Sequence, residues 1–226
     1  MTWNDVSFNQ YLDIIHYYEN SSQYGDDLDK IISLLVIFDN ELDIEEMYNK
    51  KYLEVQEMFE PIGRLLSTEI EYDSLPYEPF IEMSYGDWIN LDEYLKDRDW
   101  NGIFNTIFRK KEYNLDLDSI SPVKIFDAYL KFLDYRKETF ENYSFAFNLD
   151  PVVENDEETP EERLEREEIM KDQQQNAQFT WYLHTYDVAK GDITKFDEIF
   201  EMNHLFIFNI IDMKKRFKLN EVYRGI

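Results

Sequence analysis

The stretch AKGDITKFDEIFEMNHLFIF, residues 189–208, interrupts a long helical pattern with the pair Gly191-Asp192. Such a pair can hold an ion or a phosphate, or it can end one helix and start the next. Gly191 directly follows a periodic segment, where a residue in the left-handed conformation closes the last free carbonyls of a helix. Thr194 and Asp197 have capping spacing for a following helix. The stretch therefore predicts a corner between two helices.

Apolar periodicity on both sides of this corner predicts a long C-terminal helical hairpin over residues 177–226. The segment AQFTWYLHTYDVAK, 177–190, forms the first arm. In the second arm, two apolar faces are expected, made of Phe196, Ile199 and Phe200, and of Leu205, Phe206, Ile210, Met213 and Phe217. Four basic residues gather at its end, where positive charge complements the helix dipole: Lys214, Lys215, Arg216 and Lys218.

Residues 1–150 read as a helical core domain, and the whole chain as mainly α. Helices are expected over 7–19, 26–39, 43–61, 88–113 with a break near 97–101, and from Ser121 onward. The second half of 26–39 is apolar all round, which indicates a central helix. Pro61 is expected to limit the third helix, and Ser121-Pro122 to open the last one.

Two segments of the chain depart from this helical pattern. Residues 68–85 alternate Ile70 and Tyr72 with acids and contain two prolines, which predicts a short β-hairpin. Residues 154–172 carry ten acids and three bases. We therefore expect 151–176 to be an acidic connector or the start of an exposed helix near Thr159.

The charge balance argues against nucleic-acid binding. The chain has 23 basic and 49 acidic residues, a net charge of −26, whereas such binding needs basic groups to neutralise phosphates. The absence of cysteine excludes disulfides, thiolate metal sites and cysteine nucleophiles. The longest apolar run, 31–38, is too short to span a bilayer, so no membrane partner is expected. The 17 Phe, 17 Tyr and 4 Trp suit a chain with extensive partner interfaces.

No catalytic, cofactor or metal motif is apparent in the sequence. The corner lacks the glycine and lysine spacing of a phosphate loop. His16, His184 and His204 stand far apart, without the spacing of paired metal ligands. Residues 114–119 begin like a calcium loop, but Ser119 and Ile125 replace the required Gly and Glu. We therefore predict no enzyme activity and no cofactor.

Two segments resemble phage proteins. The segment WINLDEYLKDRDWNGIFNTIFRKK, 88–111, resembles the helical core of small tail-assembly chaperones and of neck or tail proteins of tailed bacteriophages, in which an I-x-L-x-x-Y-L helix follows a short apolar hairpin. The segment 179–218 resembles the GDITK-containing C-terminal segments of virion proteins in crAss-like phages of gut Bacteroidetes. Together the two segments cover 64 residues.

This resemblance implies a tail or neck protein made in the host cytoplasm and located in the virion. It would form a ring with copies of itself and contact other tail or neck proteins, while DNA passes by without specific binding. Carboxylates lining a conduit would remove the attraction that binding needs. Because like charges oppose assembly, basic patches must meet acidic ones at the contacts. Candidate interface residues are Arg109, Lys110, Lys111, Trp181, Tyr182, Phe206, Lys214, Lys215, Arg216 and Lys218.

Two other functions stay open at this stage. A tail-assembly chaperone outside the virion would hold an aggregation-prone tail protein and would be missing from purified particles. An acidic inhibitor that mimics DNA would bind a basic host protein in a salt-sensitive manner, and the net charge alone supports it.

Overall fold

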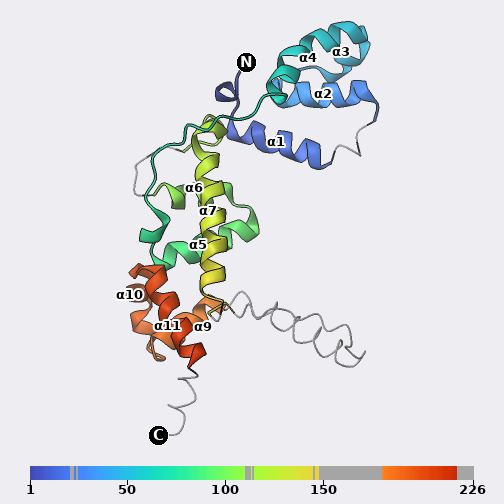
Figure 1. Cartoon of the computed structure of the whole chain (residues 1–226). Helices are drawn as coiled ribbons and strands as arrows, with labels where there is room; N and C mark the ends of the chain where they lie inside the picture. Colours follow the sequence, from blue (N-terminus) through green and yellow to red (C-terminus); the bar gives the residue numbers. More distant parts are fainter. Residues whose placement is uncertain are drawn as a thin grey trace, which may run out of the picture. The chain divides into compact units, whose positions relative to one another are not determined.

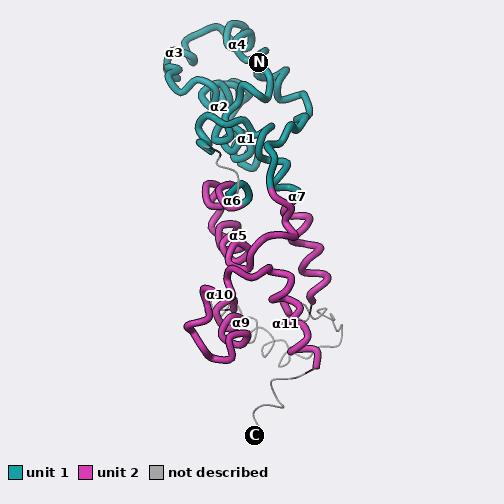
Figure 2. Tube along the Cα trace, turned by 90° about the vertical axis from the view of Figure 1, so that its left-hand side faces the viewer, with its two compact units in different colours: residues 1–77, 107–131 teal, residues 78–106, 132–226 magenta. Residues whose placement is uncertain are grey.

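The computed structural model describes residues 1–20, 23, 25–109, 113, 115–144, 146–147 and 180–217 (Figure 1). The described part is mainly helical, as the periodicity predicts, and no segment within it forms a β-strand. The chain divides into two compact units, coloured separately in Figure 2. Unit 1 comprises residues 1–77 and 107–131, and unit 2 comprises residues 78–106 and 132–226. The predicted boundaries between 148 and 179 lie outside the described residues.

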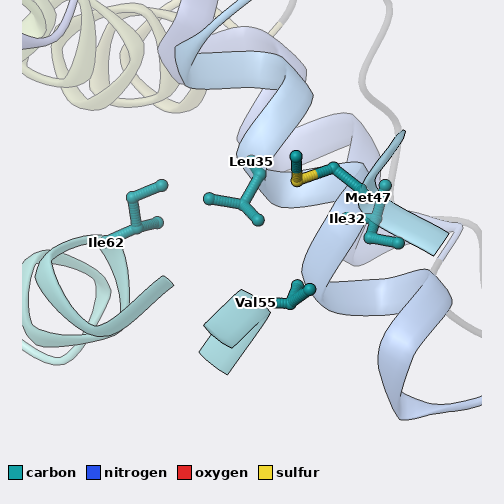
Figure 3. Close-up of a cluster of buried hydrophobic side chains, with 5 residues drawn as sticks. All are labelled: Ile32, Leu35, Met47, Val55 and Ile62. Atoms are coloured by element: carbon teal, nitrogen blue, oxygen red, sulfur yellow. The ribbon is translucent and has the colours of Figure 1, made fainter. Parts of the chain in front are cut away.

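Unit 1 is built around helix α2 (Asp27–Phe38), which packs against α1 (Phe8–Glu19), α3 (Ile44–Asn49) and α4 (Tyr52–Leu66). Its apolar cluster contains Ile32, Leu35, Met47, Val55 and Ile62, which extend toward one another in Figure 3. The central position predicted for this helix is therefore confirmed. The unit also contains the 3₁₀ turn η1 (Trp3–Asp5) and the first half of α7 (Pro122–Asn142).

Acidic caps fix where two helices of unit 1, α2 and α3, begin. The Asp26 carboxylate accepts hydrogen bonds from the backbone N–H groups of Leu28 and Asp29, so α2 starts at Asp27. Asp43 likewise accepts from the Glu46 N–H at 3.1 Å and opens α3, the start that the sequence indicates. Pro122 occupies the first position of α7, as predicted from its missing N–H.

Two predictions for unit 1 are wrong. Pro61 does not limit its helix but lies inside α4, because burial of Ile62 and Leu65 on the following turn outweighs the hydrogen bond that proline removes. Residues 43–61 are also not one helix, since Lys50 and Lys51 separate α3 from α4 in extended conformation.

The β-hairpin expected near residues 68–85 is absent from the structure. Residues 69–79 have no regular secondary structure and no strand pairing, and a 3₁₀ turn, η3 (Phe80–Glu82), follows. The backbone N–H groups of Asp73 and Leu75 instead donate to carbonyls of Val123 and Lys124 in α7, at 3.0 and 2.8 Å. Prolines nearby have no N–H with which to build a ladder.

Unit 2 surrounds helix α5 (Tyr85–Asp97), which packs against α10 (Phe196–Glu201) and α11 (His204–Arg216). Helix α9 (Thr180–Val188) packs against the same two helices, while α6 (Trp100–Ile107) follows the break after α5 that the sequence indicates. The core is aromatic, with Tyr85, Trp88, Phe132 and Phe208 buried. A single bridge, Ser84 to Asn203, joins the segments that lead into α5 and α11.

The corner predicted at Gly191 is confirmed. Gly191 adopts φ +81°, and its N–H donates to the Tyr186 carbonyl at 2.9 Å, which closes the end of α9. The next cap, however, is Asp192, whose carboxylate accepts from the Thr194 N–H at 3.1 Å and opens η5 (Ile193–Lys195). Asn203 then starts a third helix. The predicted two-armed hairpin is thus three helices, because two further cap residues follow the glycine.

Candidate interaction surface

Helix α11 has two apolar faces. Asn203 positions it, since its side-chain oxygen accepts from the N–H groups of Leu205 and Phe206 and its amide donates to the Ile81 carbonyl at 2.6 Å. One face is buried in unit 2 and consists of His204, Ile207, Phe208 and Ile211. The other, which we name the outer stripe, consists of Phe206, Ile210, Met213 and Phe217.

The outer stripe lies in solvent. Its members recur at i, i+4, i+7 and i+11, the spacing that keeps side chains on one side of a helix. Phe206 is 55% exposed and Phe217 is 65% exposed, while Met213 is exposed and Ile210 is partly exposed. A row of large apolar side chains at this spacing is typical of a helix that packs on both sides.

The charge of α11 distinguishes it from the other described helices. It carries three basic residues and one acid, a net charge of 3 − 1 = +2, whereas each of the others is neutral or negative. Two of these cations bond within unit 2: Lys214 contacts the Asp187 carboxylate at 3.0 Å, and Lys215 donates to the Ala146 carbonyl at 2.7 Å. Arg216 is more exposed and pairs with Asp212 one turn earlier at 3.1 Å.

Apart from Trp181, the candidate interface residues predicted from the sequence fall into three groups in the structure. Tyr182 and Phe206 are exposed, and so is Arg109, just after α6. Lys214, Lys215 and Arg216 have the partners given above. Lys110, Lys111 and Lys218 lie outside the described residues.

The prediction for Trp181 is wrong, because this candidate interface residue is buried. It is only 6% exposed, and its indole N–H donates to the Asp92 carboxylate at 3.2 Å. The reason is that α9 turns this side of the helix toward α5, so Trp181 packs edge-on against Tyr85 and Phe147. The exposed side of α9 carries Tyr182 with Leu183 and Tyr186 instead.

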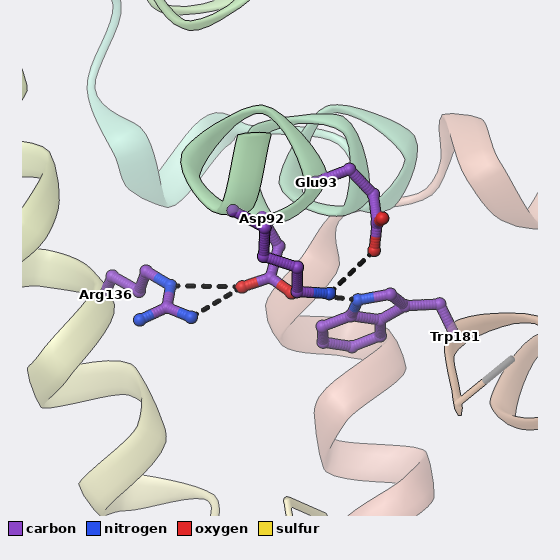
Figure 4. A network of polar contacts seen from close by, with 5 residues as sticks. Asp92, Glu93, Arg136 and Trp181 are labelled. Atoms are coloured by element: carbon purple, nitrogen blue, oxygen red, sulfur yellow. Dashed lines mark hydrogen bonds and ion pairs between the residues drawn. The ribbon is translucent and has the colours of Figure 1, made fainter. Parts of the chain in front are cut away.

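The buried carboxylate of Asp92 connects helices α5, α7 and α9 (Figure 4). Asp92 of α5 accepts from both the Nη2 and Nε of Arg136 in α7, at 2.5 and 3.2 Å, and from Trp181 in α9. Lys96 adds an ion pair at 3.2 Å. Burial alone would raise the pKa of Asp92, but the hydrogen bond and charge of Arg136, with Lys96, outweigh it and hold this pKa below its usual value.

Both ring nitrogens of the buried residue His204 lie within hydrogen-bond distance of groups in unit 2. Its Nδ1 lies 2.9 Å from the Met83 carbonyl and its Nε2 lies 2.8 Å from the Tyr135 hydroxyl. Burial lowers its pKa, so the imidazole is neutral. Within the described residues, no three His, Asp or Glu side chains gather in a way that could hold a metal ion. The same part of the chain contains no helix both long and apolar enough to cross a membrane.

A second exposed surface lies on α3 and α4 of unit 1, and we name it the acidic face. It contains Ile44, Tyr48, Tyr52 and Leu53, all exposed, with Leu53 at 64%. Seven acids and two lysines fall within residues 41–60, a charge of 2 − 7 = −5. This surface is not among those predicted from the sequence, although apolar residues at solvent-facing positions of two acidic helices are a signal that could have revealed it.

Comparison with protein-family models, with curated proteins and with solved structures gives no significant match to this chain.

Proposed function

We propose that this chain is a structural protein of the tail or neck of a tailed phage, a subunit that assembles with copies of itself around the DNA conduit. The observation that carries the proposal is the outer stripe of α11, a row of large apolar side chains in solvent on a helix whose opposite side is already buried. A surface of this kind favours a role in protein association. The resemblance of residues 88–111 and 179–218 to phage proteins supplies the setting.

The charge of the chain supports a place beside DNA without binding to it. A subunit with net charge −26 repels phosphates, so carboxylates facing a conduit would let DNA slide past. The same charge opposes assembly of the subunits, and contacts between copies must therefore bring the few basic surfaces against acidic ones.

The second candidate is a tail-assembly chaperone that is not part of the virion. The exposed apolar side chains of α9 favour it, because Tyr182, Leu183 and Tyr186 offer rings and an aliphatic chain to an aggregation-prone segment of another protein. Such a chaperone would associate with a tail protein before assembly and leave afterwards.

A mass-spectrometric inventory of purified particles of the phage that encodes this chain separates the two candidates. The structural role predicts the polypeptide in washed particles at a fixed stoichiometry to the major tail proteins. The chaperone role predicts the polypeptide in infected cells and its absence from particles. Electron microscopy of the particles then tests the ring directly, and a virion without such a ring would overturn the proposal.

A further inference from the structure

We propose that the outer stripe of α11 docks onto the acidic face of α3 and α4 in a second copy of the chain. The inference rests on the proposed function in one respect, the association of copies, and it names the two surfaces that meet. It joins unit 2 of one copy to unit 1 of the next, the two units that Figure 2 draws in different colours, so each copy offers one of each surface.

The two surfaces are both apolar at their centres. Phe206, Met213 and Phe217 are exposed on α11 and its end. Ile44 and Tyr48 are exposed on α3, and Tyr52 and Leu53 on the first turn of α4, with Lys50-Lys51 between the two helices. A single helix with a row of side chains at i, i+4 and i+7 can lie across a shallow surface of a helix pair. Aromatic anchors of this type contribute most of the binding energy in protein interfaces.

The charges of the two surfaces are opposite. Helix α11 has a net charge of +2, and Lys214 and Arg216 lie on either side of the outer stripe. Residues 41–60 have a net charge of −5, with Glu45, Glu54 and Glu57 exposed among the apolar side chains. In a chain of net charge −26, α11, the one α-helix of positive net charge among those that the structure describes, is well suited to approach an acidic neighbour.

This complementarity favours a head-to-tail contact over a twofold contact centred on either surface. A twofold axis through one of the two surfaces would place α11 against α11, or the acidic face against itself, and each arrangement brings like charges together. A head-to-tail contact pairs +2 with −5 and leaves one surface of each kind open for the next copy. Repetition of such a contact produces a ring or a filament.

The test uses the full-length chain and two double variants. Phe206→Gln with Met213→Gln replaces two of the four apolar side chains of the outer stripe, and Ile44→Gln with Leu53→Gln replaces two of the four apolar side chains of the acidic face. All four positions are exposed, so the fold should survive, and circular dichroism with a thermal melt checks this. Tyr18→Gln, at an exposed aromatic residue of α1 outside both surfaces, is the matched control.

Sedimentation velocity and native mass spectrometry over a concentration series measure the association. The wild-type chain and the Tyr18 variant should form species that grow with concentration beyond the dimer. Each double variant alone should bind itself at least about tenfold more weakly. An equal mixture of the two double variants should form a one-to-one dimer and nothing larger, because only one intact pair of surfaces remains.

Several results would overturn the inference. A double variant that assembles like the wild type shows that its surface is not used, and a mixture that stays monomeric shows that the two surfaces do not meet. A wild-type chain that is monomeric at every concentration excludes contact between copies. The inventory of particles tests the virion role separately. If particles made with either double variant still contained the ring, only the contact proposed here would be refuted. Salt is a poor substitute for these variants, because it screens both this attraction and the repulsion between acidic subunits.

Discussion

The imidazole of His204 lies parallel to the indole of Trp88, with the ring centroids 5.1 Å apart and the planes inclined by 9°. A carbonyl can only accept, so the contact with Met83 places the hydrogen on Nδ1, and Nε2 accepts from the Tyr135 hydroxyl. One side chain thereby links the start of α11 to α5, α7 and the segment before α5.

Replacing His204 with Phe should keep a stacked ring and lose both hydrogen bonds. The buried Met83 carbonyl and the partly buried Tyr135 hydroxyl would then lose this partner, and we expect the free energy of unfolding to fall by about 2 kcal/mol. Tyr135→Phe removes one hydroxyl only and should cost about half as much. Urea denaturation measures both, and a His204→Phe variant as stable as the wild type would contradict the assigned role.

Asp92 is the position in unit 2 where loss of one charge should matter most. Its side chain is only 7% exposed, and Asp92→Ala would leave Arg136 partly buried without its carboxylate partner. We expect a loss of about 3 kcal/mol or more in the free energy of unfolding. Asp92→Asn, which keeps the shape and an acceptor for Trp181, should cost less.

A surface pair provides the comparison for Asp92. Glu60→Ala removes the partner of Arg64 on the exposed side of α4, and this change should lower the free energy of unfolding by less than about 1 kcal/mol. If the two alanine variants had equal stability, the network at Asp92 would contribute no more than a surface ion pair.

The network at Asp92 also shows why the contacts in the core of unit 2 could not be predicted from the sequence. Asp92 and Trp181 are 89 positions apart, and nothing in the sequence pairs them. Helix α9 is apolar on several sides, so its pattern does not say which aromatic faces inward, and Trp181, a predicted interface residue, is buried. Helices and the Gly191 corner were predictable, since caps and periodicity act over a few residues. The prediction that Pro61 ends its helix was wrong, because burial of the following residues, which depends on distant parts of the chain, outweighs the local preference against proline inside a helix.

Gly191→Ala tests the corner at which α9 ends. At φ +81° an alanine side chain is strained, and its Cβ would also lie 3.1 Å from the Tyr186 hydroxyl. We expect a loss of about 1 kcal/mol or more in the free energy of unfolding. Gly191→Asn should cost less than alanine, because asparagine tolerates the left-handed region best among non-glycine residues. An alanine variant that is more stable than the asparagine variant would argue against this backbone conformation.

Acidification should destabilise unit 2 through two histidines, the partly buried His184 and the buried His204. Burial, and then the nearby charge of Lys215, lower the pKa of His184 from 6.5 to about 4. The unfolded chain therefore takes up a proton at a higher pH than the folded chain, so the stabilising contribution is complete above pH 6.5 and is lost as the pH falls toward 4. Burial lowers the pKa of His204 as well, which adds to the effect.

The variant His184→Gln isolates this contribution, because it titrates nothing at position 184 and retains every carboxylate. Protonation of the 49 acids affects both proteins equally and cancels in the difference between them. Between about pH 6.5 and pH 5.5 the wild type should lose about 1 kcal/mol of unfolding free energy relative to the variant. Urea denaturation at several pH values gives this difference directly. A pH-independent difference would mean that His184 titrates alike in the folded and unfolded chains, which its burial beside Lys215 argues against.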